Sequence, residues 1–117
     1  MKIVIAGSRS VNDESKVRTL IHKTLQKLNI TPTEIISGNA NGADKIGESY
    51  ARMMEIPLGL YPADWNRHGK SAGVIRNKVM AKLADVAIVF WDGESRGTKN
   101  MISEMSKLDK LCVVYII

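Results

Sequence analysis

Short apolar runs alternate with amphipathic helical patterns along the whole chain, and this alternation restricts the fold more than any other feature. Continuous apolar runs of this kind are typical of strands that are buried on both faces of a sheet. They occupy residues 2–6, 33–37, 58–61, 86–91 and 111–117. The run at 58–61 lies between Pro57 and Pro62, and proline confines a strand to a sheet edge.

Four helical patterns lie between the runs, each with apolar residues three or four positions apart. The first follows a cap at Asn12 or Asp13. The apolar positions are Val17, Leu20, Ile21, Leu25 and Leu28 in the first, Ala43, Ile46, Tyr50 and Met54 in the second, Ile75, Val79 and Leu83 in the third, and Met101, Ile102, Met105 and Leu108 in the fourth.

Buried strands that alternate with helices predict a parallel sheet covered on both faces, because right-handed crossovers leave few other topologies. We expect a single three-layer α/β/α domain over residues 1–117, with a five-stranded parallel sheet in the order 3-2-1-4-5. The winding direction reverses between strands 1 and 4, and a crevice opens there at the carboxyl ends of the strands. This crevice is the expected ligand site.

Three polar, glycine-bearing turns are expected at that crevice, at residues 7–10, 37–44 and 92–98. Glycine lets the backbone approach a ligand closely. Helices that begin near Gly42 and Gly97 would present unpaired amides and a positive dipole end to a phosphate. Three such turns together favour phosphate binding over simple chain reversal.

The net charge of +5, from 17 Lys and Arg against 12 Asp and Glu, favours an anionic partner. Arg9 follows a buried strand directly and is predicted to face the ligand, whereas Lys70 is expected to be a solvated surface charge. Arg76 and Arg96 lie in or beside the loops, and a guanidinium suits bidentate phosphate binding. Only 5% of the residues are aromatic, which gives little support to an extended platform for single-stranded nucleic acid.

Three further side chains have two possible roles each. Asp44 lies in the first turn of the second helix, where its carboxylate either complements the helix dipole or contacts a ribose hydroxyl. Trp65, in the long connection at 62–72, and Trp91, at the end of the fourth strand, either stack on a base or pack on the core. The long connection is itself a candidate functional loop.

Several chemistries lack their motifs. The sequence has neither a GxGxxG motif after the first strand nor a GxxxxGK motif followed by Ser or Thr. This absence disfavours a dinucleotide-dependent dehydrogenase and a Walker-type NTPase. His22 and His68 form no metal-ligating cluster and serve no nucleophile elbow, and Cys112 cannot form an internal disulfide. We expect no cofactor and no metal.

No apolar run approaches the length of a membrane span and no cleavage pattern is present, so we expect a cytoplasmic protein.

Five motifs resemble the YspA-related branch of the SLOG superfamily over nearly the whole chain. They are GSR at 7–9, SGNANGAD at 37–44, YPADW at 61–65, GKSAGVIRN at 69–77 and FWDGESRGT at 90–98. The resemblance implies a Rossmann-like domain, related to the LOG phosphoribohydrolases (lysine decarboxylase-like proteins) and to the DNA-processing protein DprA, that binds nucleotides or nucleotide-derived signals. It implies ligand contacts from Gly7, Ser8, Arg9, Gly38, Gly42, Asp44, Arg76, Asn77, Gly97 and Thr98. Asn39, Trp65, Asp92 and Ser95, in the same loops, complete the candidate set.

The chain departs from the family pattern at two places. Asn39 stands where relatives commonly have a second glycine, and asparagine tolerates a left-handed backbone at modest cost. LOG enzymes carry a glutamate three residues after the Gly-Thr pair, but here that position is Met101, and Glu104 comes one turn later. Glycosidic cleavage would therefore need another loop carboxylate: Asp44, Asp92 or Glu94.

These observations favour a binding module that captures a nucleotide-derived ligand as a sensor or sequestering protein. The alternatives are a nucleoside-monophosphate N-glycosidase and a DprA-like nucleic-acid-binding protein. We also expect a homo-oligomer, because the last strand, at 111–117, is an apolar sheet edge without a charge or proline to discourage pairing.

Overall fold

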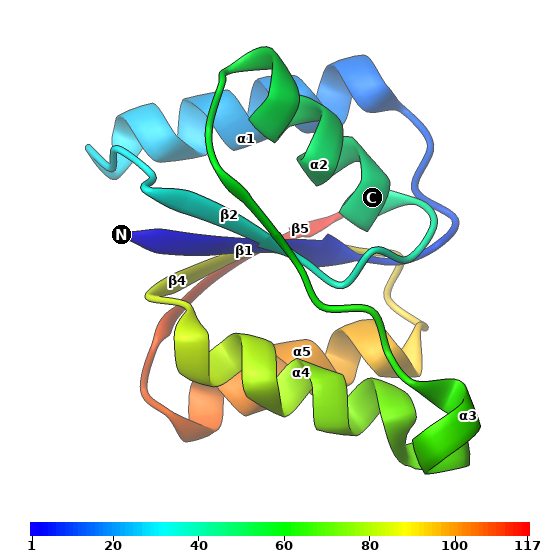
Figure 1. Cartoon of the computed structure of the whole chain (residues 1–117). Coiled ribbons are helices and arrows are strands. Elements are labelled where there is room, and N and C mark those ends of the chain that lie inside the picture. The colour runs from blue at the N-terminus through cyan, green and yellow to red at the C-terminus, as the bar shows by residue number, and fades with distance from the viewer.

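A five-stranded parallel sheet in the order β3-β2-β1-β4-β5 is the middle layer of the computed structural model, which describes residues 1–117 (Figure 1). The predicted strand order is confirmed. The strands are β1 (Lys2–Gly7), β2 (Glu34–Ser37), β3 (Leu58–Leu60), β4 (Val86–Trp91) and β5 (Leu111–Ile116).

Helices cover both faces of this sheet, as predicted. In Figure 1, α1 and α2 lie on one face and α4 and α5 on the other. The helices are α1 (Glu14–Lys27), α2 (Ala43–Met53), α3 (Trp65–His68), α4 (Ala72–Leu83) and α5 (Arg96–Lys107). None of them is long and apolar enough to cross a membrane.

Alternate residues of the central strand β1 serve two separate cores, because successive side chains of a strand point to opposite faces. Ile3 and Ile5 pack with residues of α1 and α2, whereas Val4 and Ala6 pack with residues of α4 and α5. All four are buried. This two-sided burial explains why the strands appear in the sequence as continuous apolar runs.

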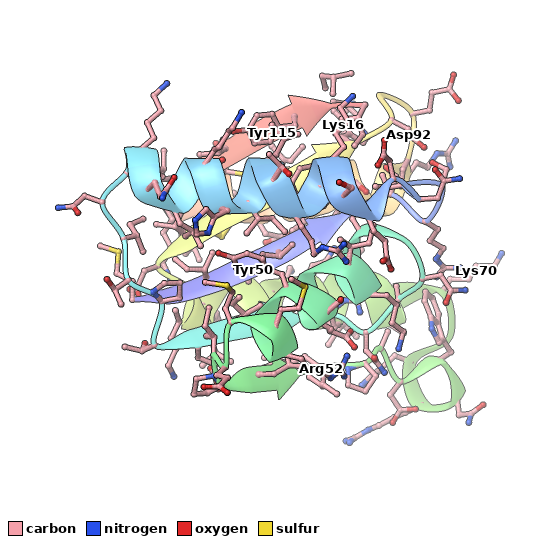
Figure 2. The ribbon with its side chains drawn as sticks, turned by 90° about the horizontal axis from the view of Figure 1, so that it is seen from above. Lys16, Tyr50, Arg52, Lys70, Asp92 and Tyr115 are labelled. Carbon is pink, nitrogen blue, oxygen red and sulfur yellow. The ribbon has the colours of Figure 1, made fainter.

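The carboxyl ends of β1, β2 and β4 bring the three glycine-bearing turns to one edge of the sheet. The chain continues the pairing of β1 with β4 past Gly7, where the Ser8 amide donates to the Phe90 carbonyl at 2.9 Å. The Ser8 carbonyl in turn accepts from the Ala43 amide at 3.3 Å, so the start of α2 lies against the first turn. Figure 2 shows Asp92 and Lys70 at this end of the molecule, toward which the β1 arrow points.

The predicted apolar face of the third long helix is wrong. Ile75, Val79 and Leu83 of α4 are 39%, 43% and 38% exposed. The face that packs on the sheet and on α5 instead carries Ala72, Asn77, Met80 and Ala81. The small alanine side chains let this helix pack closely, and the larger apolar side chains are left outside.

The connection at 62–72 is not an open loop. It contains α3 and a single turn of 3-10 helix at Gly69–Ser71. The Asp64 carboxylate caps α3 by accepting from the Arg67 amide at 3.1 Å. This local cap determines the position of Trp65 at the start of the short helix.

We expect Phe90→Ala to lower the free energy of unfolding by about 3 to 5 kcal/mol, because it leaves a cavity in the core. Phe90 is fully buried in β4, and its ring stacks on that of Tyr115 with centroids 5.5 Å apart. Urea unfolding followed by circular dichroism measures the change. Ile116→Ala is the control: that side chain is 67% exposed, so its effect should stay within about 0.5 kcal/mol. Equal effects of the two variants would contradict this assignment of the core.

Candidate functional site

A cavity of about 110 Å³ lies at the carboxyl ends of β1 and β4, between the starts of α2 and α5 and the side of α4. Its walls combine backbone from the glycine-bearing turns with polar side chains and a floor of methionines. The lining residues are Ala6, Gly7, Arg9, Ala40, Asp44, Trp65, Gly73, Arg76, Asn77, Met80, Ser95, Gly97, Thr98 and Met101.

A second hollow of about 250 Å³ adjoins the first. The two share Arg9, Ala40, Trp65 and Arg76, so they form one continuous depression, which we call the cleft. The second hollow is bounded by the turn after β2 and by the chain that leads into α3. Its lining residues are Arg9, Gly38, Asn39, Ala40, Asn41, Pro62, Ala63, Trp65 and Arg76.

Arg76 lies at the junction of the two hollows and is held by three groups. Its Nη1 donates to the Gly38 carbonyl at 2.6 Å and to the Tyr61 carbonyl at 3.4 Å, and its Nε donates to Asn77 Oδ1 at 3.0 Å. A Cβ at Gly38 would overlap the guanidinium, so this close approach requires glycine. Nη2 has no protein acceptor and is left available to a ligand.

Asp44 is buried beside Arg76 in the first turn of α2. Its Oδ2 accepts from the Ala40 amide at 3.2 Å. Burial raises the pKa of Asp44 to about 6, and the Ala40 hydrogen bond and the positive charge of Arg76 offset only part of that rise. The cleft therefore contains a carboxyl group that exchanges its proton near neutral pH.

A second buried carboxylate, Glu48, lies one helical turn beyond Asp44, and the sequence analysis missed it. Its Oε2 accepts from the Ser37 hydroxyl at 2.8 Å, and its Oε1 lies 3.8 Å from Lys45 Nζ and 3.7 Å from Arg52 Nη2. The negative charge of Glu48 contributes to the raised pKa of Asp44. The four-residue spacing from Asp44, with a cation on either side, was the signal that could have identified it.

The start of α5 opens into the cleft without a capping side chain. Ser95 is the N-cap residue and makes no side-chain cap hydrogen bond. The Gly97 position faces open space, and the amides of Gly97 and Thr98 have no acceptor in the protein. Unpaired amides at a helix start, together with the helix dipole, favour an anion.

Asn77 lines the cavity, but its side chain is fully used within the protein. Its Oδ1 accepts from Arg76 Nε, and its amide nitrogen donates to the Gly97 carbonyl at 3.2 Å and to Asn100 Oδ1 at 2.9 Å. Asn77 therefore ties the guanidinium to the start of α5. It positions both features and has no free donor for a ligand.

Ser8 and Asp92 shape the turns and do not line the cleft. The Asp92 carboxylate accepts from the amides of Glu94 and Ser95 at 2.9 and 2.7 Å, and these bonds hold the pKa of Asp92 below its usual value. The Ser8 hydroxyl accepts from the Asp92 amide at 3.1 Å and lies 3.4 Å from Thr98 Oγ1. Both side chains therefore act through the loop that follows β4.

Arg9, which the sequence analysis predicts to face the ligand, lines both hollows, and its side chain is exposed at the mouth of the cleft. Trp65 is 51% exposed at the same mouth, and the edge of its ring lies over Gly73. Asn39 has a φ of +60°, the left-handed backbone expected where relatives have glycine.

The remaining candidate residues lie outside the cleft. Trp91 donates from Nε1 to the Ser95 carbonyl at 3.1 Å and so supports the start of α5. Gly42, with a φ of +80°, brings its backbone against Ser8 and Arg9, where a Cβ would collide. Lys70 and Arg96 are exposed and line neither hollow.

We expect stability to fall as pH rises from about 4 to about 6, through the titration of Asp44. The folded-state pKa of about 6 exceeds the unfolded value near 3.8, so the folded state retains the proton more strongly and loses this advantage as Asp44 ionises. The loss amounts to about 3 kcal/mol at most. The variant Asp44→Asn lacks this titration. In urea titrations, the unfolding free energy of the variant minus that of the wild type should therefore increase between pH 4 and pH 6. Parallel pH profiles would contradict the assignment.

Comparisons with known proteins agree with this architecture. The YAcAr family model, described as the YspA, cpYpsA-related SLOG family, matches residues 1–68. The Gene 61 protein of Mycobacterium phage D29 is 34% identical over 114 residues, which cover 91% of this chain and 89% of the phage protein.

Two solved structures of DprA share the fold. DprA from Streptococcus pneumoniae superimposes with a TM-score of 0.72 at 19% identity, over 97% of this chain and 49% of DprA. DprA from Helicobacter pylori, described with a single-stranded DNA binding mode, gives a TM-score of 0.65 at 22% identity, over 97% of this chain and 64% of DprA. The chain thus spans half to two thirds of these proteins. The match to the family model over residues 1–68, more than half of the chain, shows that this chain is a member of the YspA, cpYpsA-related SLOG family.

Proposed function

We propose that the chain binds a nucleotide or nucleotide-derived ligand in the cleft, as a sensor or sequestering protein. The observation that carries this proposal is the meeting of two unsatisfied anion-binding groups: the open start of α5 and the free Nη2 of Arg76. Both border the cavity of about 110 Å³. A phosphate placed there would accept hydrogen bonds from the backbone amides and a charge-assisted hydrogen bond from the guanidinium.

The larger hollow offers groups suited to the rest of a nucleotide. Trp65 presents an exposed ring at its mouth, on which a base could stack. Asp44 lies in the adjoining cavity, where its carboxylate suits a ribose hydroxyl. One cleft thus contains a cation, a carboxyl group and an aromatic ring, from Arg76, Asp44 and Trp65. This combination favours a nucleotide over inorganic phosphate as the ligand.

The glycosidase alternative lacks a carboxylate at the position where the LOG motif has one. Met101 occupies that position and contributes an apolar side chain to the cavity floor. Glu104 is buried and pairs with Lys107 Nζ at 3.5 Å, away from the cleft. Asp44 is the single carboxylate that lines the cavity, and one acid group without a partner favours binding over the two-carboxylate chemistry of glycosidic cleavage.

Arg9→Ala is expected to weaken the affinity for the best-binding nucleoside 5′-monophosphate about tenfold. A hydrogen bond to a charged group is worth about 1.5 to 3 kcal/mol, and the exposed position of Arg9 places it at the lower end. Calorimetry with the nucleoside monophosphates as a panel measures the change.

Arg18→Ala is the matched control for Arg9. Arg18 is on α1 and pairs with Glu14 at 3.1 Å, so its removal lowers the net charge equally without touching the cleft. Its affinity should equal that of the wild type. No binding by any member of the panel, or equal losses in the two variants, would contradict the proposal.

Binding of single-stranded DNA is the second candidate, favoured by the likeness to the Helicobacter pylori protein and by the net charge of +5. The salt dependence of binding distinguishes single-stranded DNA binding from the binding of one nucleotide in the cleft. For single strands the logarithm of the binding constant falls with a slope of about −0.7 per phosphate contacted.

For a twelve-nucleotide oligothymidylate we expect a slope of about −1.4 or shallower, because the two anion-binding groups of the cleft, the start of α5 and Arg76, would contact two phosphates at most. Fluorescence anisotropy over a salt series gives this slope. A slope steeper than about −3 would show that several phosphates are neutralised and would favour the DNA-binding candidate instead.

A further inference from the structure

Glu104 is a buried carboxylate on the inner side of α5, and it does not line the cleft. It shares that side of the helix with the core methionines Met101 and Met105. Its side chain is 8% exposed, whereas its cation Lys107, at 3.5 Å, is 64% exposed. Removing a carboxylate from water costs about as much free energy as such an ion pair returns, so the pair alone does not explain this residue. Its other neighbour, Asn100, connects it to the cleft.

A continuous chain of side-chain hydrogen bonds runs from Arg76 on α4 to Glu104 on α5. Arg76 Nε donates to Asn77 Oδ1 at 3.0 Å, and Asn77 Nδ2 donates to Asn100 Oδ1 at 2.9 Å. Asn100 Nδ2 then donates to Glu104 Oε2 at 3.4 Å. We call these four side chains the relay. It crosses between two helices that contact each other on the same face of the sheet (Figure 1).

All the bonds of the relay point in the same direction, and the groups at its two ends determine that direction. A guanidinium can only donate, so Asn77 must turn its oxygen toward Arg76. A carboxylate can only accept, so Asn100 must turn its amide nitrogen toward Glu104. If either asparagine amide were rotated by half a turn, two donors or two acceptors would face each other. The acceptor at Glu104 therefore selects the amide orientation that Arg76 requires at the other end.

The relay also holds the start of α5. Asn77 Nδ2 has two hydrogens, of which one goes to Asn100 and the other to the Gly97 carbonyl at 3.2 Å. No buried side-chain nitrogen or oxygen atom lacks a partner, so the network is complete as it stands. The Arg76 guanidinium and the open start of α5 thus keep a fixed relative position. Groups that bind a ligand are most effective when further hydrogen bonds hold them in place.

We propose that Glu104 is a positioning residue for the ligand cleft and acts on Arg76 through the two asparagines of the relay. It contacts no ligand itself, but it keeps Nη2 of Arg76 available beside the start of α5. Hydrogen bonds in such a chain polarise one another, so the loss of one end weakens the others. The effect on ligand affinity rests on the proposed function, whereas the relay itself can be measured without a ligand.

The hydrogen-exchange rate of the Arg76 Nε proton tests the relay in the ligand-free protein. We expect Glu104→Ala and Asn100→Ala to increase this rate about tenfold, because each breaks the chain beyond Asn77. Glu104→Gln should stay within about twofold of the wild type, since its amide oxygen can still accept from Asn100. NMR of the isotope-labelled protein measures the rates, and Arg76→Lys identifies the signal by its loss.

The Nε proton of Arg18, on the opposite face of the sheet, is the internal reference and should exchange equally in all variants. Melting curves check that each variant folds. If the exchange of the Arg76 proton is unchanged in both alanine variants, or increases equally for Arg18, the proposal is overturned.

Calorimetry with the nucleoside 5′-monophosphate that binds best in the panel measures the effect on the cleft. We expect Glu104→Ala to weaken this affinity about fivefold, and Glu104→Gln to leave it within about twofold. In an Arg76→Lys background, which keeps the charge but lacks Nε, Glu104→Ala should have no further effect. Glu34→Ala is the matched control: it removes a carboxylate at the amino end of β2, and its affinity should equal that of the wild type.

Equal losses from Glu104→Ala in the wild-type and Arg76→Lys backgrounds would overturn the proposal, because Glu104 would then act independently of Arg76. A loss from Glu104→Gln as large as that from Glu104→Ala would overturn it as well. If no nucleotide binds to the wild type, the proposed function fails, and the exchange of the Arg76 proton still decides whether Glu104 holds that side chain.

Discussion

The pairing of β1 with β4 is the constraint on which the rest of the site depends. These strands are distant in the sequence but adjacent at the centre of the sheet, in register from Ile3 with Val86 to Gly7 with Phe90. The chain winds to one side from β1 and to the other from β4, so the turns that follow them diverge and leave the cleft between them. The Ser8 amide extends the pairing by one more bond, to Phe90, and so fixes where the first turn begins.

Within the cleft, the half-buried cation of Arg76 and the buried carboxyl of Asp44 depend on each other. Removing Arg76 from water lowers its pKa, and removing Asp44 from water raises the pKa of that carboxyl, yet each charge favours the ionised form of the other. The surrounding backbone reduces the cost of burial, since carbonyls of Gly38 and Tyr61 accept from Arg76 and an amide donates to Asp44. A bound anion would alter this balance, because it adds negative charge beside both groups.

The same helix serves two surfaces through opposite sides. On the inner side of α4, Asn77 connects Arg76 to the start of α5. On the outer side, Ile75 and Val79 are exposed and line a groove of about 310 Å³ beside the end of β3. Arg76 lines this groove as well as the cleft, so the two hollows meet at one side chain.

Much of this fold follows from the sequence alone. Short continuous apolar runs that are rich in β-branched residues and end in turns favour buried parallel strands over helices. The handedness of the crossovers then leaves few strand orders. The glycine-bearing turns are local features, and their meeting at one sheet edge follows from the parallel arrangement. The left-handed backbone at Asn39 was likewise readable from its residue type.

The tertiary structure alone decided which side of α4 is buried and which polar groups reach the cleft. Periodicity places Ile75, Val79 and Leu83 on one face but cannot tell that face from the one with Ala72 and Ala81, since the distance to α5 and the sheet selects the smaller side chains. The role of Asn77 depends on its partners Gly97 and Asn100 near the start of α5, which spacing along α4 does not encode. Sequence determines where a side chain lies along its own element, and packing between elements determines what that side chain contacts.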